Sequence, residues 1–359
     1  MRRWTTLAPV LSVLLLAGTW GRKDLPGVVV AVVAVVLAGA VLAAVHHAEV
    51  VAHRVGEPYG SLVLAVAVTV IEVGLIVTLM VSGGDGTETL ARDTVFAAVM
   101  ITCNGIVGLS LLIGAFRRGT ASFNAEGTGG ALATLTVLAT LSLVLPTFTT
   151  GASGSEFTTA QLAFAAVASI VLYGLFVLTQ TVRHRDYFLP VGDEDGDGVE
   201  DEHAAPPSNR AALTSLGLLM VALVGVVGLA KVESPSIEKA VDAAGFPQAV
   251  VGVVIALLVL LPETIAAANA ARRDRVQISL NLGLGSAMAS IGLTIPAIAV
   301  ASIWLDGPLV LGLGATQLAL LVLTVVVSAL TIVPGRATRL QGEVHLVLFA
   351  AFVFLAVNP

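Results

Sequence analysis

Residues 59–80, "YGSLVLAVAVTVIEVGLIVTLM", form an almost unbroken apolar run with one carboxylate, Glu72, near its middle. Residues 246–270, "FPQAVVGVVIALLVLLPETIAAANA", repeat this design, with Glu263 well inside the run. About 20 apolar residues in a helix span the roughly 30 Å hydrocarbon core of a bilayer. A charged side chain there is costly and usually faces a bundle interior or an aqueous cavity. The two stretches therefore predict membrane-spanning helices that carry glutamates toward an interior.

The whole chain shares this apolar character. Of its 359 residues, 57% are hydrophobic and 12% are charged, whereas a soluble domain carries about 25% charged residues. Backbone polar groups in lipid must be satisfied within their own segment, which favours helices over strands. We therefore predict an all-α polytopic membrane protein with about 11 transmembrane helices. The predicted segments are residues 5–20, 26–52, 59–82, 94–116, 131–149, 158–182, 211–230, 246–270, 277–304, 308–333 and 342–357.

Several other classes of protein are disfavoured. The N-terminal "MRRWTTLAPVLSVLLLAGTW" begins like a signal peptide but lacks a small-residue cleavage site, so we expect it to remain as the first helix. The single cysteine, Cys103, lies in an apolar segment and predicts neither a disulfide nor a cysteine-based metal site. The net charge is −6, and no basic patch suggests a nucleic-acid partner. We expect no cofactor and a lipid bilayer as the surrounding medium.

Lys and Arg residues predict the orientation, because positive residues accumulate on the cytoplasmic side. With the N-terminus inside, thirteen of the 18 basic residues fall on the cytoplasmic side. This bias places the N-terminus and the acidic loop in the cytoplasm and the C-terminus outside, in the cell (inner) membrane. The thirteen are Arg2, Arg3, Arg54, Arg117, Arg118, Arg183, Arg185, Arg210, Arg272, Arg273, Arg275, Arg336 and Arg339.

The segments divide into an N-terminal helix (residues 1–24), a five-helix unit (25–182), an acidic loop (183–210) and a second five-helix unit (211–359). Two successive units of five spans must have opposite orientations, because five is odd. Inverted repeats are typical of secondary transporters, whose substrate site lies near the midplane between them. Glu72 and Glu263 each occupy the second helix of their unit. One such glutamate could be a structural hydrogen-bonding group, but two at equivalent places favour a shared site.

The helix after each glutamate carries further polar groups. Residues 96–114, "FAAVMITCNGIVGLSLLIG", and 277–300, "QISLNLGLGSAMASIGLTIPAIAV", align at Gly-Leu-Ser 108–110 and Gly-Leu-Thr 292–294. Their serines and glycines could also serve close helix packing alone. The candidate cation or proton ligands are Glu72, Glu263, Asn104, Thr102, Ser286 and Ser290.

These groups supply only oxygen ligands, which suit a hard cation such as Ca²⁺. Pro262 removes one backbone hydrogen bond and leaves the carbonyl of Leu258 as a further candidate ligand. Burial disfavours a charged carboxylate, so the same two glutamates are expected to hold protons when no cation is bound. The residues therefore predict a cation/proton exchanger with Glu72 and Glu263 as ligands of the transported ion.

Three stretches resemble the calcium/cation antiporter superfamily, most closely bacterial Ca²⁺/H⁺ (also Na⁺/H⁺) antiporters of the ChaA type. They are "HHAEVVAHRVGEPYGSLVLAVAVTVIEV", "MITCNGIVGLSLLIG" and "VLLPETIAAANAARRDRVQISLNLGLGSAMASIGLTIP". The resemblance implies an inverted five-plus-five fold with two α-repeats, residues 58–116 and 246–304. It also implies one essential glutamate per repeat and alternating access driven by the proton gradient. Thr69, Val70 and Ile71 stand where better-known members have Gly-Asn-Ala, which leaves the cation open.

Glu49 matches a further acidic residue common in proton-exchanging members of that superfamily. His46, Glu49 and His53 fall one or two turns apart on one helix face. Histidines with an unperturbed pKa of about 6.5 could relay protons or sense pH. The alternative is an interfacial polar collar, and we keep both interpretations.

Residues 191–203, "VGDEDGDGVEDEH", begin like a calcium-binding EF-hand loop, with Asp193, Asp195 and Asp197 at ligand positions. Position 12 is Ala204 instead of the bidentate glutamate, and prolines flank the run. We expect a solvated acidic linker, with weak cytoplasmic cation collection as the alternative.

The sequence thus predicts a secondary transporter that exchanges Ca²⁺ for H⁺, and not an enzyme. A Na⁺/H⁺ or K⁺/H⁺ antiporter of the same fold is the closest alternative. A cation channel or an intramembrane enzyme fits less well, because an Mg²⁺-diphosphate enzyme needs two Asp-rich motifs and the chain has one acidic run.

Overall fold

The computed structural model describes residues 3–22, 25–56, 59–82, 87–190, 207–305 and 307–359. Within these ranges, ten helical spans are long and apolar enough to cross a membrane, and an eleventh apolar helix has 17 residues. The helices before residue 190 are α1 (Arg3–Thr19), α2 (Gly27–Val55), α3 (Tyr59–Ser82), α4 (Leu90–Met100), α5 (Val107–Arg118), α6 (Ala125–Ala139), α7 (Leu145–Phe148) and α8 (Thr159–Leu178). Those after it are α9 (Asn209–Ala243), α10 (Ala249–Arg272), α11 (Val276–Ala289), α12 (Ile295–Ala301), α13 (Ala315–Ile332) and α14 (Arg339–Val357).

Short π-helical segments join several of these helices into continuous spans. They are η2 (Ile101–Ile106), η3 (Thr140–Val144), η4 (Thr179–Arg183) and η6 (Ser290–Thr294). A 3-10 turn, η1 (Thr87–Thr89), precedes α4, and another, η5 (Arg185–Phe188), follows η4. The predicted all-α fold is therefore confirmed: one N-terminal helix precedes two inverted sets of five spans.

The helix bundle has two opposite faces, and each span runs from one face to the other. We call the end where α2, α5, α8 and α10 finish and α9 starts the linker face, and the opposite end, where α14 finishes, the C-terminal face. On the linker face, Arg54 Nε donates to Asn209 Oδ1 at 2.8 Å and joins the end of α2 to the start of α9.

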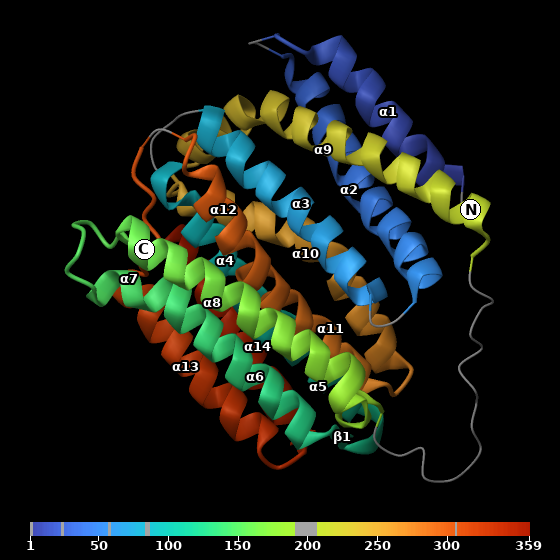
Figure 1. The fold of residues 1–359 in the computed structure, drawn as a ribbon, viewed down its shortest axis with the longest axis vertical. Coiled ribbons are helices and arrows are strands. Elements are labelled where there is room, and N and C mark those ends of the chain that lie inside the picture. The colour runs from blue at the N-terminus through green and yellow to red at the C-terminus, as the bar shows by residue number, and fades with distance from the viewer. Residues whose placement is uncertain (1–2, 23–24, 57–58, 83–86, 191–206, 306) are drawn as a thin grey trace.

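Helices α1, α2 and α9 pack together along one side of the molecule (Figure 1). Small residues permit this close approach. A Cβ on Gly225 of α9 would meet Ser12 Oγ at 2.0 Å, and one on Gly228 would meet the Leu16 side chain at 2.3 Å. Helix α9 also touches α3, where Gly74 faces Val227. These helices share one apolar cluster with α3 and α10, and the other spans build a second cluster.

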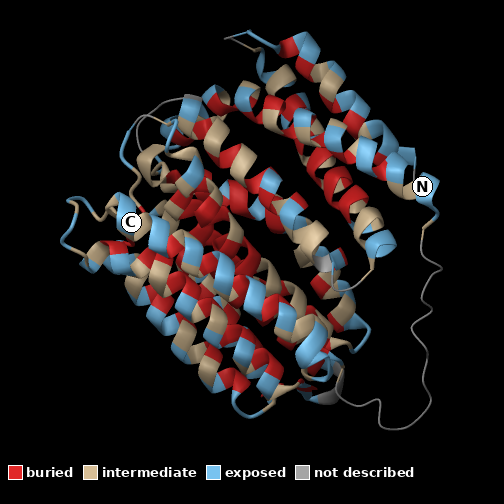
Figure 2. Cartoon of the chain, viewed as in Figure 1, coloured by how far each residue is buried: buried red, intermediate tan, exposed pale blue. Residues whose placement is uncertain are grey.

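The third span of each repeat lies at the centre of the protein. In Thr87–Phe116, 78% of the apolar window is buried, and in Val276–Ala301 it is 61%, against 44% or less in every other candidate span. Buried residues accordingly concentrate inside the bundle, and exposed ones line its outer helices (Figure 2). Both central spans are interrupted by a π-helical segment, η2 or η6. Such segments often mark functional sites in helices.

Two short strand pairings tie the repeats together. On the linker face, β1 (Thr120–Ser122) pairs antiparallel with β2 (Arg336–Thr338). Gly119, with a φ of 79°, ends α5 in the left-handed conformation and turns the chain into β1. On the C-terminal face, Glu156 forms an isolated antiparallel bridge with Val310.

Several predicted segments have the wrong bounds: the spans predicted to begin at residues 94 and 131 begin at Thr87 and Ala125, and two others differ as follows. Helix α9 runs to Ala243 instead of residue 230, because its polar end still packs inward at Glu233, Ser234 and Val241. Helix α13 begins at Ala315 instead of residue 308, because the residues before it pair with the chain at residues 143–156. Helix α10 stays continuous through Pro262.

Candidate functional site

Glu72 lies in a closed site between the two repeats. Its side chain projects from α3 and is only 4% exposed. Two hydroxyls of η6 donate to its carboxylate: Ser290 Oγ to Oε1 at 2.6 Å and Thr294 Oγ1 to Oε2 at 3.0 Å. Hydrogen bonds to a charged group are roughly twice as strong as neutral ones. The first repeat therefore supplies the acid, and the second supplies its donors.

Glu263 lies at an open cavity instead. Its Oε2 atom is buried but has no hydrogen-bond partner among the residues that the structure describes. The carboxyl lines a cavity of about 230 Å³ that extends from it toward the linker face. Buried polar atoms in proteins are nearly always satisfied by protein, water or an ion. The other lining residues are Leu64, Ala65, Val68, Tyr173, Phe176, Val177, Gln180, Ile278, Asn281, Leu282, Gly285, Ser286 and Ala289.

The two glutamates share one wall. A second cavity, of about 10 Å³, touches Glu72, and Val68, Ser286 and Ala289 line both cavities. A cavity of about 10–15 Å³ holds at most one water, so the space at Glu72 is closed while that at Glu263 admits several waters. The wall shared by the two cavities carries one hydroxyl, that of Ser286.

The sequence of the two repeats matches a known family. The sequence model of the family described as sodium/calcium exchanger protein matches residues 25–182 and 214–358, which are most of the chain. The chain belongs to this exchanger family. Its fold is therefore that of a membrane cation exchanger.

Two relatives cover nearly the whole exchanger. The "Putative ionic transporter y4hA" of Sinorhizobium fredii is 47% identical over 99% of this chain and 96% of its own. The "Sodium-potassium/proton antiporter ChaA" of Escherichia coli is 36% identical over 96% of this chain and 93% of its own. Among solved structures, the H⁺/Ca²⁺ exchanger CAX superposes with a TM-score of 0.71 at 16% identity, over 98% of this chain and 86% of its own. That likeness supports the fold alone.

The exchanger brings Ser286 and Ser290 to the glutamates but places Asn104 and Thr102 elsewhere. Asn104 Nδ2 donates to Thr324 Oγ1 at 2.9 Å, and its Oδ1 lies 3.2 Å from Nδ1 of His345. Thr102 Oγ1 donates to the carbonyls of its own helix. No hydrogen bond joins either residue to a glutamate within the described part of the chain. Their predicted role as ligands is not supported by this arrangement.

The predicted relay residues lie near the linker-face end of α2. Glu49 is exposed. His53 is exposed, whereas His46 is half-buried and its ring meets that of His47 at 5.6 Å. His47, which the sequence did not single out, is fully buried with Nε2 2.9 Å from the carbonyl of Thr5. A relay role for Glu49 stays a prediction.

Sequence reasoning missed the contribution of α8 to the site. Tyr173 is 6% exposed and lines the Glu263 cavity together with Gln180. A Cβ on Gly292 of η6 would meet Tyr173 Cβ at 2.7 Å, so this glycine lets α8 approach. No motif marks either polar residue, because α8 reaches the site only through the packing of the bundle.

Other predicted positions give no further ligand. Asp193, Asp195 and Asp197 lie outside the described residues. Within the described ranges, no group of three or more His, Cys, Asp or Glu residues is arranged to hold a metal ion.

Proposed function

We propose that this exchanger moves Ca²⁺ against protons across the membrane by alternating access, with Glu72 and Glu263 binding the cation or protons in turn. The observation that carries the proposal is the contrast between the two acids. Among the described residues, one oxygen of Glu263 has no partner at a cavity, while Glu72 is held by two hydroxyls behind the same wall. Alternating access opens a site to one face at a time, and an unpartnered acid at a cavity toward one face supports such a site.

Each group has a chemical task in this cycle. A divalent cation reaching Glu263 meets two carboxylates, whose charges offset the cost of removing its hydration shell. The hydroxyls of Ser290 and Thr294, which now donate to Glu72, can rotate and present lone pairs to a cation. Ser286 would supply a further oxygen from the wall between the acids. When the cation leaves, protons neutralise the two carboxylates and avoid a pair of buried like charges.

The proposed orientation places the linker face in the cytoplasm. The basic residues of the chain gather at this end, as membrane proteins favour on the cytoplasmic side. The Glu263 cavity extends toward the same end through the early part of α11 and the end of α8. In this proposal the structure is therefore open to the cytoplasm, in the cell membrane, with the C-terminus outside.

A second candidate is exchange of Na⁺ or K⁺ for protons. It is supported by the 36% identity to the sodium-potassium/proton antiporter ChaA over nearly the full length. Thr69, Val70 and Ile71 precede Glu72 and offer no amide ligand, which reduces the number of oxygens for Ca²⁺. The same two carboxylates would then serve a monovalent ion.

Everted membrane vesicles test the proposal. A fluorescent probe reports the pH gradient, and Ca²⁺, Na⁺ or K⁺ is added separately. We expect Ca²⁺ to dissipate the gradient in a saturable way, and Glu72→Gln and Glu263→Gln to abolish this response. Glu343→Gln, at an exposed position of α14, is the matched control and should respond like the unaltered protein.

Each outcome separates the candidates. A response to Na⁺ or K⁺ without one to Ca²⁺ favours the second candidate. Cation flux that needs no opposing proton movement would indicate a channel. No response to any of the three cations, with protein present in the membrane, overturns the proposed function.

A further inference from the structure

The cavity at Glu263 has walls that an inorganic cation would leave largely unused. Nine of its 14 lining residues are apolar side chains or glycine, and they come from α3, α8 and α11. Hard cations bind oxygen atoms and gain no ligand from such walls. On α11 the apolar wall is one stripe, since residues three or four apart share a helix face: Ile278, Leu282, Gly285 and Ala289.

Two aromatic rings from α8 belong to the same walls. Tyr173 and Phe176 are both buried, and both line the cavity. Aromatic rings attract organic cations, and quaternary ammonium ions in particular are recognised in this way. The walls therefore offer an organic cation both apolar and aromatic contacts, which a metal ion does not need.

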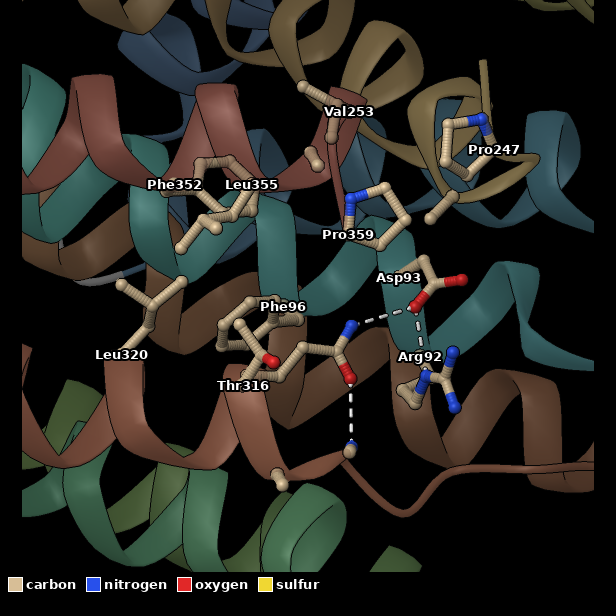
Figure 3. A pocket seen from close by; sticks show the side chains of 15 residues that line it. Arg92, Asp93, Phe96, Pro247, Val253, Thr316, Leu320, Phe352, Leu355 and Pro359 are labelled. Carbon is tan, nitrogen blue, oxygen red and sulfur yellow. Dashed lines mark hydrogen bonds and ion pairs between the residues drawn. The ribbon is translucent and has the colours of Figure 1, made fainter. Parts of the chain in front are cut away.

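The acid of this cavity has an oxygen that the described protein leaves unsatisfied, namely Glu263 Oε2. A larger cavity, of about 280 Å³, differs in this respect. Figure 3 shows its carboxylate, Asp93, bonded to Arg92, and Thr89 and Gln317 also donate to it. Buried polar atoms are nearly always satisfied. The protein itself satisfies Asp93, whereas Glu263 requires a ligand, a water or a proton.

Gly285 leaves room in the middle of the apolar stripe. A Cβ built on it would meet no atom within 4 Å. A Cβ on Gly283, two residues earlier, would meet Ile106 at 3.2 Å. Gly283 therefore serves close packing of the bundle, whereas Gly285 enlarges the cavity and makes space for an alkyl group.

We propose that the Glu263 cavity binds small amphipathic ammonium ions, with the positive nitrogen at Glu263 and the alkyl chain along α3, α8 and α11. The inference rests on the proposed role of Glu263 as a cation ligand and extends it to organic cations. Apolar walls strengthen the attraction between opposite charges, because the local dielectric constant is low. Each methylene buried against them adds hydrophobic free energy. The organic ion takes the place of the metal ion and so competes with it.

Hexyltrimethylammonium is a suitable probe, because its charge is permanent and it carries no proton across the membrane. Binding of the ¹⁴C-labelled probe to the full chain in nanodiscs is measured by equilibrium dialysis, with empty nanodiscs as the baseline. Tetramethylammonium has the charge without the chain, and hexanol has the chain without the charge. We expect saturable binding of the probe, and displacement by either competitor only at concentrations roughly tenfold or more above that of unlabelled probe.

Two variants test the charge and the wall separately. Glu263→Gln should weaken probe binding roughly tenfold or more, because it removes the buried charge that pairs with the nitrogen. Gly285→Leu should weaken it by a similar factor, because the new side chain occupies the space for the alkyl group. Gly174→Leu is the matched control: it lies on the exposed side of α8, outside the cavity, where a Cβ also meets no atom within 4 Å. It should bind the probe like the unaltered protein.

Everted vesicles test the competition with Ca²⁺, because the linker face is their outer side in the proposed orientation. The probe should raise the half-saturating Ca²⁺ concentration and leave the maximal rate of exchange unchanged. A lower maximal rate at an unchanged half-saturating concentration would place the organic ion outside the Glu263 site and overturn the inference.

Three binding results would also overturn it: no saturable binding above that of empty nanodiscs, equal binding by Glu263→Gln and the unaltered protein, or equal binding by Gly285→Leu and Gly174→Leu. Displacement by hexanol as effective as that by the unlabelled probe would show a purely apolar site and has the same consequence. Failure of the proposed function is recognised separately. A protein that binds the probe through Glu263 but exchanges none of the three metal cations would keep this inference and lose the exchange function.

Discussion

Glu72 and Glu263 occupy equivalent positions in two inverted repeats, yet their surroundings differ. Glu72 is bound by two hydroxyls in a space for a single water, and Glu263 leaves one oxygen without a partner at a cavity of about 230 Å³. The sequence alignment explains part of the difference. Residues 108–110 align with 292–294, so Ser110 corresponds to Thr294 and Ile106 to Ser290. The second repeat thus brings two donors to its partner's acid, whereas the described residues of the first repeat bring none to Glu263.

The difference shows that two repeats of related sequence can have different surroundings at equivalent residues in one structure. In an inverted-repeat transporter, one half open to one face implies the other half closed to the opposite face. The donors of η6 give the closed state a favourable arrangement at Glu72. The asymmetry can be tested by altering each acid and its surroundings in turn.

The largest effect is expected from the acids themselves. Glu72→Gln and Glu263→Gln should each abolish exchange, and the shorter Glu→Asp variants should separate the two sites. Glu263→Asp keeps a carboxylate beside a cavity where water can bridge the lost methylene, so part of the activity should remain. Glu72→Asp cannot keep both bonds, to Ser290 and Thr294, and should be nearly inactive. Uptake of ⁴⁵Ca²⁺ driven by the pH gradient measures this, and a more active Glu72→Asp would contradict the assignment.

A smaller effect is expected when the donors to Glu72 are removed. Ser290→Ala combined with Thr294→Val deletes two hydrogen bonds to a carboxylate, and one such bond is worth about 1.5–3 kcal/mol. In the proposed cycle the same hydroxyls become cation ligands, so their loss should raise the half-saturating cation concentration roughly tenfold, which corresponds to about 1.4 kcal/mol of binding free energy. It is measured in the vesicle assay.

Ser110→Ala is the matched control for the donor variant. Its hydroxyl occupies the position equivalent to Thr294 but bonds Ser279 and the carbonyl of Ile106, not a carboxylate. Its half-saturating concentration should change little. If Ser110→Ala weakened cation binding as much as the double variant, the contrast between the two repeats would be lost.

The cluster around Asn104 should affect stability more than cation binding. Asn104→Ala removes one hydrogen-bond partner each from the buried side chains of Thr324 and His345, at a cost of about 1–3 kcal/mol. Thermal unfolding in detergent should occur at a lower temperature, and Thr324→Val should act in the same direction. The half-saturating cation concentration should stay as in the unaltered protein. A large loss of affinity in Asn104→Ala would restore this residue as a ligand.

The smallest effect is expected from the acidic run. Replacing residues 193–202 with a neutral Gly/Ser segment of equal length should leave the apparent Ca²⁺ affinity unchanged, if these residues form a solvated linker. The same vesicle assay measures it over a range of Ca²⁺ concentrations. A weaker affinity would instead indicate that the acidic residues collect cations for the Glu263 cavity.

Local properties of the sequence predicted the helices and the two acids. Hydrophobic length and the cost of a charge in lipid are features of single segments, so residues 59–80 and 246–270 could be identified without knowledge of packing. The partners of the acids depend on how helices pack and rotate. Asn104 and Thr102 lie within η2, where the π-helical turn changes the rotation of the side chains. Counting along an ideal helix therefore could not show that Asn104 bonds α13 and α14.

Separation along the sequence set a second limit on which site residues could be predicted. Tyr173 and Gln180 enter the site from a helix roughly 90 residues before Glu263 along the chain, and nothing in their own segment marks them. Ser290 could be identified because it shares an α-repeat with Glu263. That it bonds the other repeat's acid is a property of the assembled bundle.

The two strand pairings restrict how the protein can move. The β1–β2 pair ties the α5–α6 connection to the α13–α14 connection at one end, and the Glu156–Val310 bridge ties the α7–α8 connection to the α12–α13 connection at the other. Helices α5–α8 and α12–α14, which flank these connections, are therefore joined across the repeats at both faces, and we call them the paired helices. Neither pairing includes α1, α2 or α9, which meet the rest mainly through side chains and small residues. A shift that opens Glu72 and closes Glu263 would break the fewest backbone hydrogen bonds if α1, α2 and α9 moved relative to the paired helices.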